Sequence, residues 1–411
     1  MPQIKENFFE NVLFRFESCS CDCVTDLEHI APGEEPIRKY KLQALPESKL
    51  LFAYAAKKGL VRIAPNGTIE EANVLGTLMA LPNKSVKDLS SFMKENGFLF
   101  PVSTGSYEEI DANTLYSIME RLRMTVELMT AANEIHKDYQ KILLLTINLL
   151  FAGDLTIQTS AMAHAYSTKH HSYIDLLQSA NFNVSYEREQ EAFNSDYYTV
   201  TDSIYGSYQL PIQEYNDIAG GYSTKPGFND PLFRNITALY LNLESSDIER
   251  KITDLLFHYF HEVGMLNFCN GPAYYEDPNL DAFTKEMKEA LLEIARYIIG
   301  EEINANLDGI HPVYNADTMA PSWKVDNLLC ALYFSIFYLK PDLELYRPCD
   351  NPNCGKYFLV KTTSTKTRYC STECCNRVTQ ARYRKKRRER VEQLSQQESA
   401  FGTSTPLAPH S

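Results

Sequence analysis

The chain has 411 residues, of which 44% are hydrophobic and 23% charged, so it can fill a hydrophobic core and is not a disordered protein. Its net charge is −13, and its longest apolar runs, at 142–153 and 327–339, are shorter than the roughly 20 residues that cross a bilayer. The first residues lack the pattern of a signal peptide, so we expect a soluble, cytoplasmic protein.

The first 110 residues contain short segments without a strong period. Ser85 is a good helix cap and Gly97 a good helix stop, which together mark one helix between them. The other apolar segments are separated by glycine and by a Pro-Asn-Gly turn. In chain order we expect a helix, a strand and two further helices, over 49–59, 60–64, 69–81 and 85–97.

From residue 113 onward the pattern is mainly helical. Leu115, Ile118, Leu122 and Val126 recur at steps of three and four residues, which places them on one helix face. A stretch rich in tyrosine and threonine predicts a hairpin within 186–212. Helices are expected over 113–150, 239–262, 281–302 and 323–339. The fold class predicted from these elements is mainly α, with a minor strand content.

Five of the ten cysteines lie between Cys349 and Cys375, a spacing typical of a metal site in a reducing compartment. Cys349 and Cys354 flank a turn-rich segment, and Cys370 follows fifteen residues later. Two short-range pairs joined by such a connection suit tetrahedral zinc. Because four thiolates leave no open coordination position, we expect one structural Zn²⁺ rather than a catalytic ion.

The fourth ligand is either Cys374 or Cys375. Ser371 is a good N-cap, so both cysteines fall in the first turn of a helix, where adjacent side chains point about 100° apart. Only one can face the ion, and we favour Cys374. The segment between the cysteine pairs predicts a small hairpin covered by Tyr357 and Phe358.

The runs LYRPCDNPNCGKYFLV and RYCSTECCNRVTQARYRKKR resemble the CGNR-type zinc finger of bacterial predicted transcription regulators. The resemblance places the Cys-Gly-Asn-Arg motif on Cys374, Cys375, Asn376 and Arg377, with Cys375 in place of the glycine. The last cysteine gap is also three residues here instead of four. The resemblance covers about 50 residues and implies a mostly helical N-terminal domain before the finger.

A strongly basic helix follows the last cysteine, and its run of like charges repels itself unless a polyanion neutralises it. We therefore expect this helix to contact nucleic acid, with duplex DNA as the first target. A membrane is not favoured, because the helix carries few large apolar residues. Its candidate nucleic-acid-binding residues are Arg377, Arg382, Arg384, Lys385, Lys386, Arg387, Arg388 and Arg390.

The charge is divided along the chain. Residues 349–390 carry 12 basic and 3 acidic residues, whereas the rest carries 28 basic and 50 acidic ones. An alternative function follows from this division, namely a protein-interaction module whose basic finger docks on an acidic partner or on the chain's own acidic body. We expect a mostly helical body of unknown role at 1–340, the finger with its basic helix at 346–394 and a disordered tail at 395–411.

Other clusters are weaker. His258, His261 and Glu262 do not follow the order of a zinc protease, so we expect ordinary core or surface histidines. Alternating cysteines at 19, 21 and 23 predict a second metal site with His29 only if they lie on a strand, and we do not favour it. No phosphate loop or catalytic motif is present, so the sequence predicts no enzyme.

Overall fold

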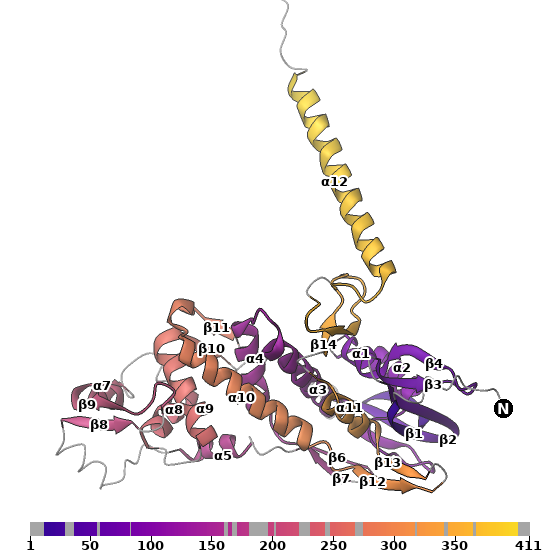
Figure 1. The fold of residues 1–411 in the computed structure, drawn as a ribbon, viewed down its shortest axis with the longest axis horizontal. Helices are drawn as coiled ribbons and strands as arrows, with labels where there is room; N and C mark the ends of the chain where they lie inside the picture. The colour runs from indigo at the N-terminus through magenta and orange to yellow at the C-terminus, as the bar shows by residue number, and fades with distance from the viewer. Residues whose placement is uncertain are drawn as a thin grey trace, which may run out of the picture.

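The computed structural model describes residues 12–28, 37–55, 58–82, 84–159, 163–166, 171–180, 196–200, 203–221, 231–242, 247–267, 274–316, 319–340, 344–364 and 367–401. About 49% of this structure is helical and 27% is strand, arranged in several sheets. The fold is therefore α+β, and the predicted mainly α class with minor strand content is wrong. The difference arises mainly in the first 110 residues, where long strands replace the expected short elements (Figure 1).

An antiparallel sheet forms one end of the molecule (Figure 1). Its strands lie in the order β1-β2-β3-β4, and β5 pairs with a separate part of β2. The strands are β1 (Val12–Glu28), β2 (Ile37–Ala55), β3 (Gly59–Ile63), β4 (Ile69–Asn73) and β5 (Glu108–Asp111). In β1, buried Phe14 and Phe16 alternate with exposed neighbours, as expected for a strand with one face on the core.

The helix expected over 49–59 is wrong, because most of this segment belongs to β2. Phe52, Ala53, Tyr54 and Ala55 are all buried, so both faces of this part of the strand are covered. A strand buried on both faces loses its alternation and cannot be distinguished from a buried helix by period alone. The strand expected at 60–64 is confirmed as β3.

Two short helices follow β4. The helix expected over 69–81 begins later, as α1 (Val74–Met79), because Asn73 ends the strand and accepts a hydrogen bond from the Gly76 amide at 2.8 Å. The helix expected over 85–97 is confirmed as α2 (Val86–Asn96), with its N-cap at Ser85 and its C-cap at Gly97.

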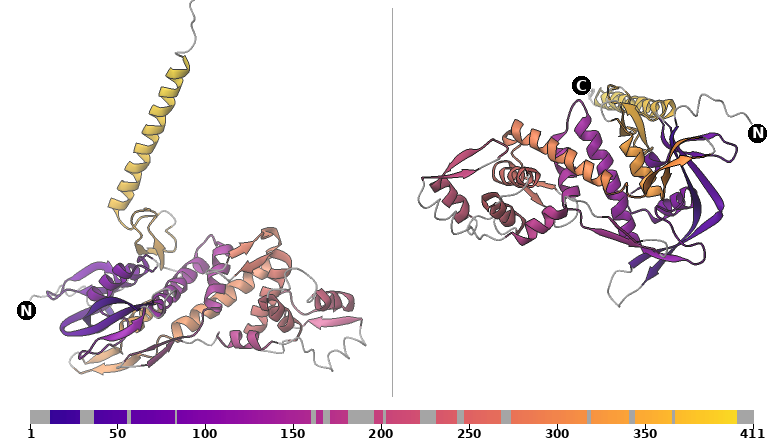
Figure 2. Two further views of the ribbon diagram at one scale, coloured as in Figure 1. Left: turned by 180° about the vertical axis from the view of Figure 1, so that it is seen from behind. Right: turned by 60° about the horizontal axis from the view of Figure 1, so that its bottom comes forward.

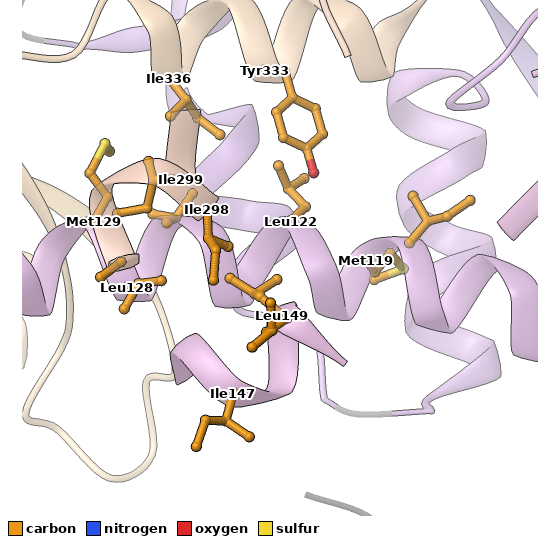
Figure 3. Close-up of a cluster of buried hydrophobic side chains, with 14 of the residues drawn as sticks. Met119, Leu122, Leu128, Met129, Ile147, Leu149, Ile298, Ile299, Tyr333 and Ile336 are labelled. Atoms are coloured by element: carbon orange, nitrogen blue, oxygen red, sulfur yellow. The ribbon is translucent and has the colours of Figure 1, made fainter. Parts of the chain in front are cut away.

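Four helices form the centre of the molecule (Figure 1). They are α3 (Ala112–Asn133), α4 (Tyr139–Leu150), α10 (Lys285–Asn304) and α11 (Leu328–Phe337). Figure 3 shows Leu122 and Met129 of α3 beside Ile298 and Ile299 of α10, with Tyr333 of α11 above them. These side chains are buried, so the central core joins segments far apart in the sequence.

One ion pair lies inside this core. Arg121 Nη2 lies 2.6 Å from Glu302 Oε1, and the two side chains are only 2% and 0% exposed. Burial raises the pKa of Glu302, although the charge of Arg121 opposes this shift. Loss of either partner would leave a buried charge without its counter-ion.

A second helical lobe lies at the end opposite the sheet (Figures 1 and 2). Its helices are α5 (His171–Ser179), α7 (Ile212–Gly221), α8 (Pro231–Asn242), α9 (Asp247–His258) and the short helices η3 (Tyr259–Val263) and η4 (Leu280–Ala282). The helix expected over 239–262 is thus divided between α8, α9 and η3. The hairpin expected within 186–212 is confirmed in its described part as β8 (Tyr197–Val200) and β9 (Tyr208–Pro211).

Three further hairpins connect these parts: β6 (Leu155–Gln158) with β7 (Ala163–Tyr166), β10 (Met265–Asn267) with β11 (Tyr274–Glu276), and β12 (Ile310–Asn315) with β13 (Ala320–Val325). The helix expected over 323–339 is shorter than predicted. Trp323 lies in β13, and the helix begins only after Asn327, whose side chain accepts a hydrogen bond from the Cys330 amide at 2.8 Å. No helix among the described residues has the length and apolarity to span a membrane.

The C-terminal module begins with β14 (Glu344–Pro348), which pairs with β15 (Tyr357–Lys361). The hairpin expected between the two cysteine pairs is therefore wrong, because the partner of β15 lies before Cys349 and not after it. The last element, α12 (Thr372–Phe401), projects away from the rest of the molecule (Figures 1 and 2). It reaches into the tail that was expected to be disordered, and residues 402–411 lie outside the described part.

Candidate metal centre and basic helix

The first two cysteines lie in a turn-rich segment, residues 349–356, called the knuckle below. Hydrogen bonds of its own backbone hold it in place. The Cys349 amide donates to Lys356 O at 2.8 Å, and the Cys354 amide donates to Asn351 O at 2.9 Å. The Asn351 side chain accepts from the amide of Asn353 at 3.2 Å. Gly355 has a φ of 64°, a conformation that glycine adopts without strain. These turns bring the thiols of Cys349 and Cys354 to one side.

The other two ligands reach the same point from the start of α12, because Cys370 lies just before the helix and Cys374 in its first turn. The sulfurs of Cys349, Cys354, Cys370 and Cys374 all lie within 4.8 Å of one another. Cys370 Sγ lies 3.5 Å from Cys354 Sγ and 3.6 Å from Cys374 Sγ. Four sulfurs at about 2.3 Å from one zinc ion would be separated by about 3.8 Å. The donor set therefore fits one tetrahedral zinc ion, and because all four ligands are protein thiols this zinc is structural.

The structure identifies Cys374 as the fourth ligand. Its amide donates to Ser371 Oγ at 3.2 Å, which confirms Ser371 as the cap that starts α12. Cys374 is buried and lies within the cluster, whereas the neighbouring Cys375 is half-buried and lies outside it. Asn376 and Arg377, the other two positions of the motif, are exposed.

The thiols of the cluster differ in acidity before a metal binds. The side chain of Asn351 lowers the pKa of Cys374 to about 6, while burial raises the pKa of Cys370 to about 12. Zinc must displace the protons of its thiol ligands, so its binding is favoured as pH rises.

The finger is also attached to the body. The Tyr357 hydroxyl donates to Glu127 Oε1 at 2.6 Å, and Arg347 Nε lies 3.1 Å from Glu134 Oε1. Thr130 Oγ1 donates to the carbonyl oxygen of Tyr346 at 3.0 Å, and Tyr346 is 2% exposed. Sequence patterns gave no signal for these contacts, because they join α3 to residues more than two hundred positions away.

The predicted nucleic-acid-binding side chains all lie on α12, and each is exposed: Arg377, Arg382, Arg384, Lys385, Lys386, Arg387, Arg388 and Arg390. Lys385 lies 3.9 Å from Glu389 within the same helix. In the part of the chain that the structure describes, no ion pair joins these eight residues to the acidic body, and α12 stands clear of it (Figure 2). The structure thus gives no support to self-docking of this helix.

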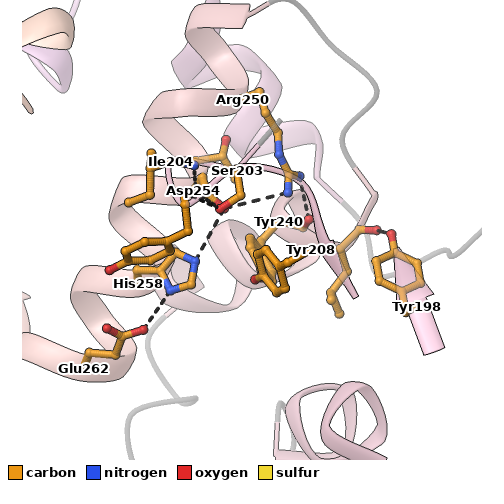
Figure 4. Close-up of polar contacts among 12 residues, drawn as sticks. Tyr198, Ser203, Ile204, Tyr208, Tyr240, Arg250, Asp254, His258 and Glu262 are labelled. Carbon is orange, nitrogen blue, oxygen red and sulfur yellow. Dashed lines mark hydrogen bonds and ion pairs between the residues drawn. The ribbon is translucent and has the colours of Figure 1, made fainter. Parts of the chain in front are cut away.

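Of the two histidines expected to be ordinary core or surface residues, His258 is buried and His261 exposed, and His258 belongs to a polar network in the second lobe (Figure 4). His258 Nδ1 lies 2.8 Å from Glu262 Oε1, and its Nε2 lies 3.6 Å from Asp254 Oδ1. Asp254 Oδ2 also accepts hydrogen bonds from Ser203 Oγ at 2.8 Å and the Ile204 amide at 2.7 Å. Burial lowers the pKa of His258, but Asp254 and Glu262 together outweigh this and raise it.

The second metal site that we did not favour is not formed by the described residues. Cys19, Cys21 and Cys23 lie on a strand, β1, as that site would require, but a register shift separates Cys19 from Cys21. Cys21 Sγ donates to Met93 O at 3.3 Å and Cys23 Sγ to Ser90 Oγ at 3.5 Å. His29 lies outside the described residues.

Comparison with known families identifies the finger alone. Residues 346–387 match the family model of the CGNR zinc finger, which confirms the resemblance predicted for this module. The match begins inside β14 and ends within α12, so it contains all four ligands. Comparisons with curated proteins and with solved structures found no match to the chain.

Proposed function

We propose that this protein binds nucleic acid through α12, with duplex DNA as its first target, and that it acts as a transcription regulator. The observation that carries the proposal is the position of α12, which extends from the zinc site into solvent with its eight basic side chains exposed. A helix with this charge is neutralised best by the regularly spaced phosphates of a nucleic acid.

The zinc site has a mechanical role in this proposal. Ser371 caps α12 and Cys374 lies in its first turn, so the ion and the cap together fix the direction in which the helix leaves the body. Lysine and arginine side chains would contact phosphates, and arginines near the start, such as Arg377, Arg382 and Arg384, would reach guanine edges in a major groove. A helix that lost this support would pay a larger entropy cost on binding.

In this proposal the body senses a ligand or mediates association with another protein, and it catalyses no reaction. Outside residues 349–390 the chain has 28 basic and 50 acidic residues, so the body repels a polyanion. This repulsion would confine nucleic acid to the finger and its immediate surroundings.

The test uses the full chain, because the finger is bonded to α3 of the body. Zinc-loaded protein should shift a labelled duplex at low salt, and chelated protein should not. A charge variant with Lys385, Lys386, Arg387 and Arg388 all changed to Gln should retain zinc and lose binding. Equal binding before and after chelation, or unchanged binding by the charge variant, would contradict the proposal. Binding to polyglutamate as tight as to DNA would favour the acidic-protein alternative instead.

A further inference from the structure

A cavity of about 780 Å³ lies where the finger meets the body, directly beside the zinc site. Lys58, Asn73, Gly76 and Thr77 line it from the body. The finger contributes the knuckle, β15 and the first turns of α12. The cavity therefore exists only in the assembled chain, since each part supplies one wall.

Three cations from three different segments line this cavity: Lys58, Lys356 and Arg377. All three side chains are exposed, and among the described residues none of them forms an ion pair. Glu373 is the acidic side chain among the described lining residues. The described part of the chain therefore gives none of these three cations a carboxylate partner.

The zinc site itself must be included in this balance, because four thiolates and one Zn²⁺ carry a formal charge of −2. Lys356 and Arg377 follow the ligands Cys354 and Cys374 closely in sequence, so they can balance this charge within the finger. Lys58 is not part of this charge balance within the finger, because it belongs to the body.

The backbone of Lys58 is fixed on both sides. Its amide donates to Ala55 O at 3.0 Å, and its carbonyl accepts from Asn73 Nδ2 at 2.5 Å. The same Asn73 caps α1. This turn therefore fixes the backbone from which the Lys58 side chain lines the cavity, and that side chain pairs with no carboxylate among the described residues.

The cavity also lies at one end of a basic row on α12. At 100° per residue, Arg384 and Arg388 each fall within about 20° of Arg377 around the helix, one on either side, and the three residues span about 16 Å along it. Arg377 lines the cavity, so a polyanion that follows this row toward the zinc site arrives at the cavity mouth.

We propose that this cavity binds a phosphate group of the nucleic-acid backbone, with Lys58 of the body and Lys356 and Arg377 of the finger as its contacts. This inference rests on the proposed function and extends the nucleic-acid interface from α12 onto the body. The contacts of β14 with α3 and of β15 with α1 hold the two walls of the cavity in fixed positions relative to each other.

The test is the salt dependence of duplex binding by the zinc-loaded full chain. Lys58→Gln should lower the slope of log K against log salt by about 0.9, the value for one lost phosphate contact on duplex DNA. Between 50 and 200 mM salt, the affinity of the unchanged protein should then fall about 3.5-fold more than that of the variant. Lys58→Arg should keep the original slope, since it keeps the charge.

Lys285→Gln is the matched control, because Lys285 is 80% exposed at the start of α10, in another part of the molecule. It should not change the slope. An unchanged slope for Lys58→Gln would overturn the inference while leaving the proposed function intact. A lowered slope accompanied by loss of zinc would also overturn it, because Lys58 would then serve the metal site. No duplex binding by the unchanged protein would overturn the proposed function itself.

Discussion

Tyr357 of the zinc finger and Glu127 of the body are joined by a hydrogen bond of 2.6 Å across 230 positions of sequence. Tyr357 follows the knuckle, and Glu127 lies on the central helix α3. The finger is therefore part of the same packed structure as the body, and the direction of α12 depends on both.

Removal of this bond should destabilise the whole chain. Tyr357→Phe deletes the hydroxyl that donates to a carboxylate, which we expect to lower the free energy of unfolding by about 1–2 kcal/mol. Urea denaturation measures the effect. Tyr383→Phe is the control, since Tyr383 is 69% exposed on α12 and its loss should change stability little. If both variants have the stability of the unchanged protein, the finger and body are not coupled through Tyr357.

Removal of zinc should also lower the thermal stability of the body. Tyr346 lies in the strand that leads to Cys349, and it is 2% exposed against the body. Because zinc binding contributes directly to folding of such a module, we expect a chelator to lower the melting temperature of the body by several degrees. Calorimetry with and without chelator would show this. Two independent transitions, with only the smaller one sensitive to chelator, would contradict the expectation.

The fourth ligand can be tested by exchange of sulfur for oxygen at two adjacent positions. Cys374→Ser should lose zinc, because Cys374 Sγ lies in the four-sulfur cluster. Cys375→Ser should keep one zinc per chain. Metal quantification after dialysis distinguishes the two variants, and retention of zinc by Cys374→Ser alone would assign the fourth position to Cys375.

The buried ion pair of the central core should be sensitive to loss of one charge. Glu302→Gln leaves the Arg121 guanidinium buried without its counter-ion, which we expect to cost about 3–5 kcal/mol of unfolding free energy. Glu289→Gln is the control, because its pair with Lys285 has side chains 66% and 80% exposed and contributes little. Equal denaturation midpoints for the two variants would contradict the role given to Arg121 and Glu302.

The His258 network should make stability depend on pH. The folded pKa of His258 is raised, so its contribution is complete below the unfolded value of about 6.5 and is lost as pH rises through the folded pKa. Glu262→Gln should therefore destabilise the protein more at pH 6 than at pH 9. The difference should stay below about 1 kcal/mol, because the Glu262 side chain is 41% exposed. A destabilisation that is the same at both pH values would contradict this.

Local signals in the sequence predicted the zinc site well. The spacing of Cys349, Cys354 and Cys370 and the cap at Ser371 act over a few residues, and the structure brings these groups together as expected. The caps of α2, at Ser85 and Gly97, were predictable for the same reason.

Long-range pairing was not predictable in this way. The C-terminal end of β2 is buried on both faces, so its apolar run has no alternation and has the pattern of a buried helix. The strand that pairs with β15 lies before Cys349, whereas the sequence predicts a hairpin between the two cysteine pairs. No local sequence pattern in either segment predicts the contact between Tyr357 and Glu127.

The salt dependence of duplex DNA binding by the zinc-loaded full chain tests the central claim most directly. If α12 contacts about four to eight phosphates, log K should fall against log salt with a slope between about −4 and −7, and chelation should abolish binding. A slope near zero, or the same affinity with and without zinc, would contradict the claim that this finger holds a nucleic-acid-binding helix.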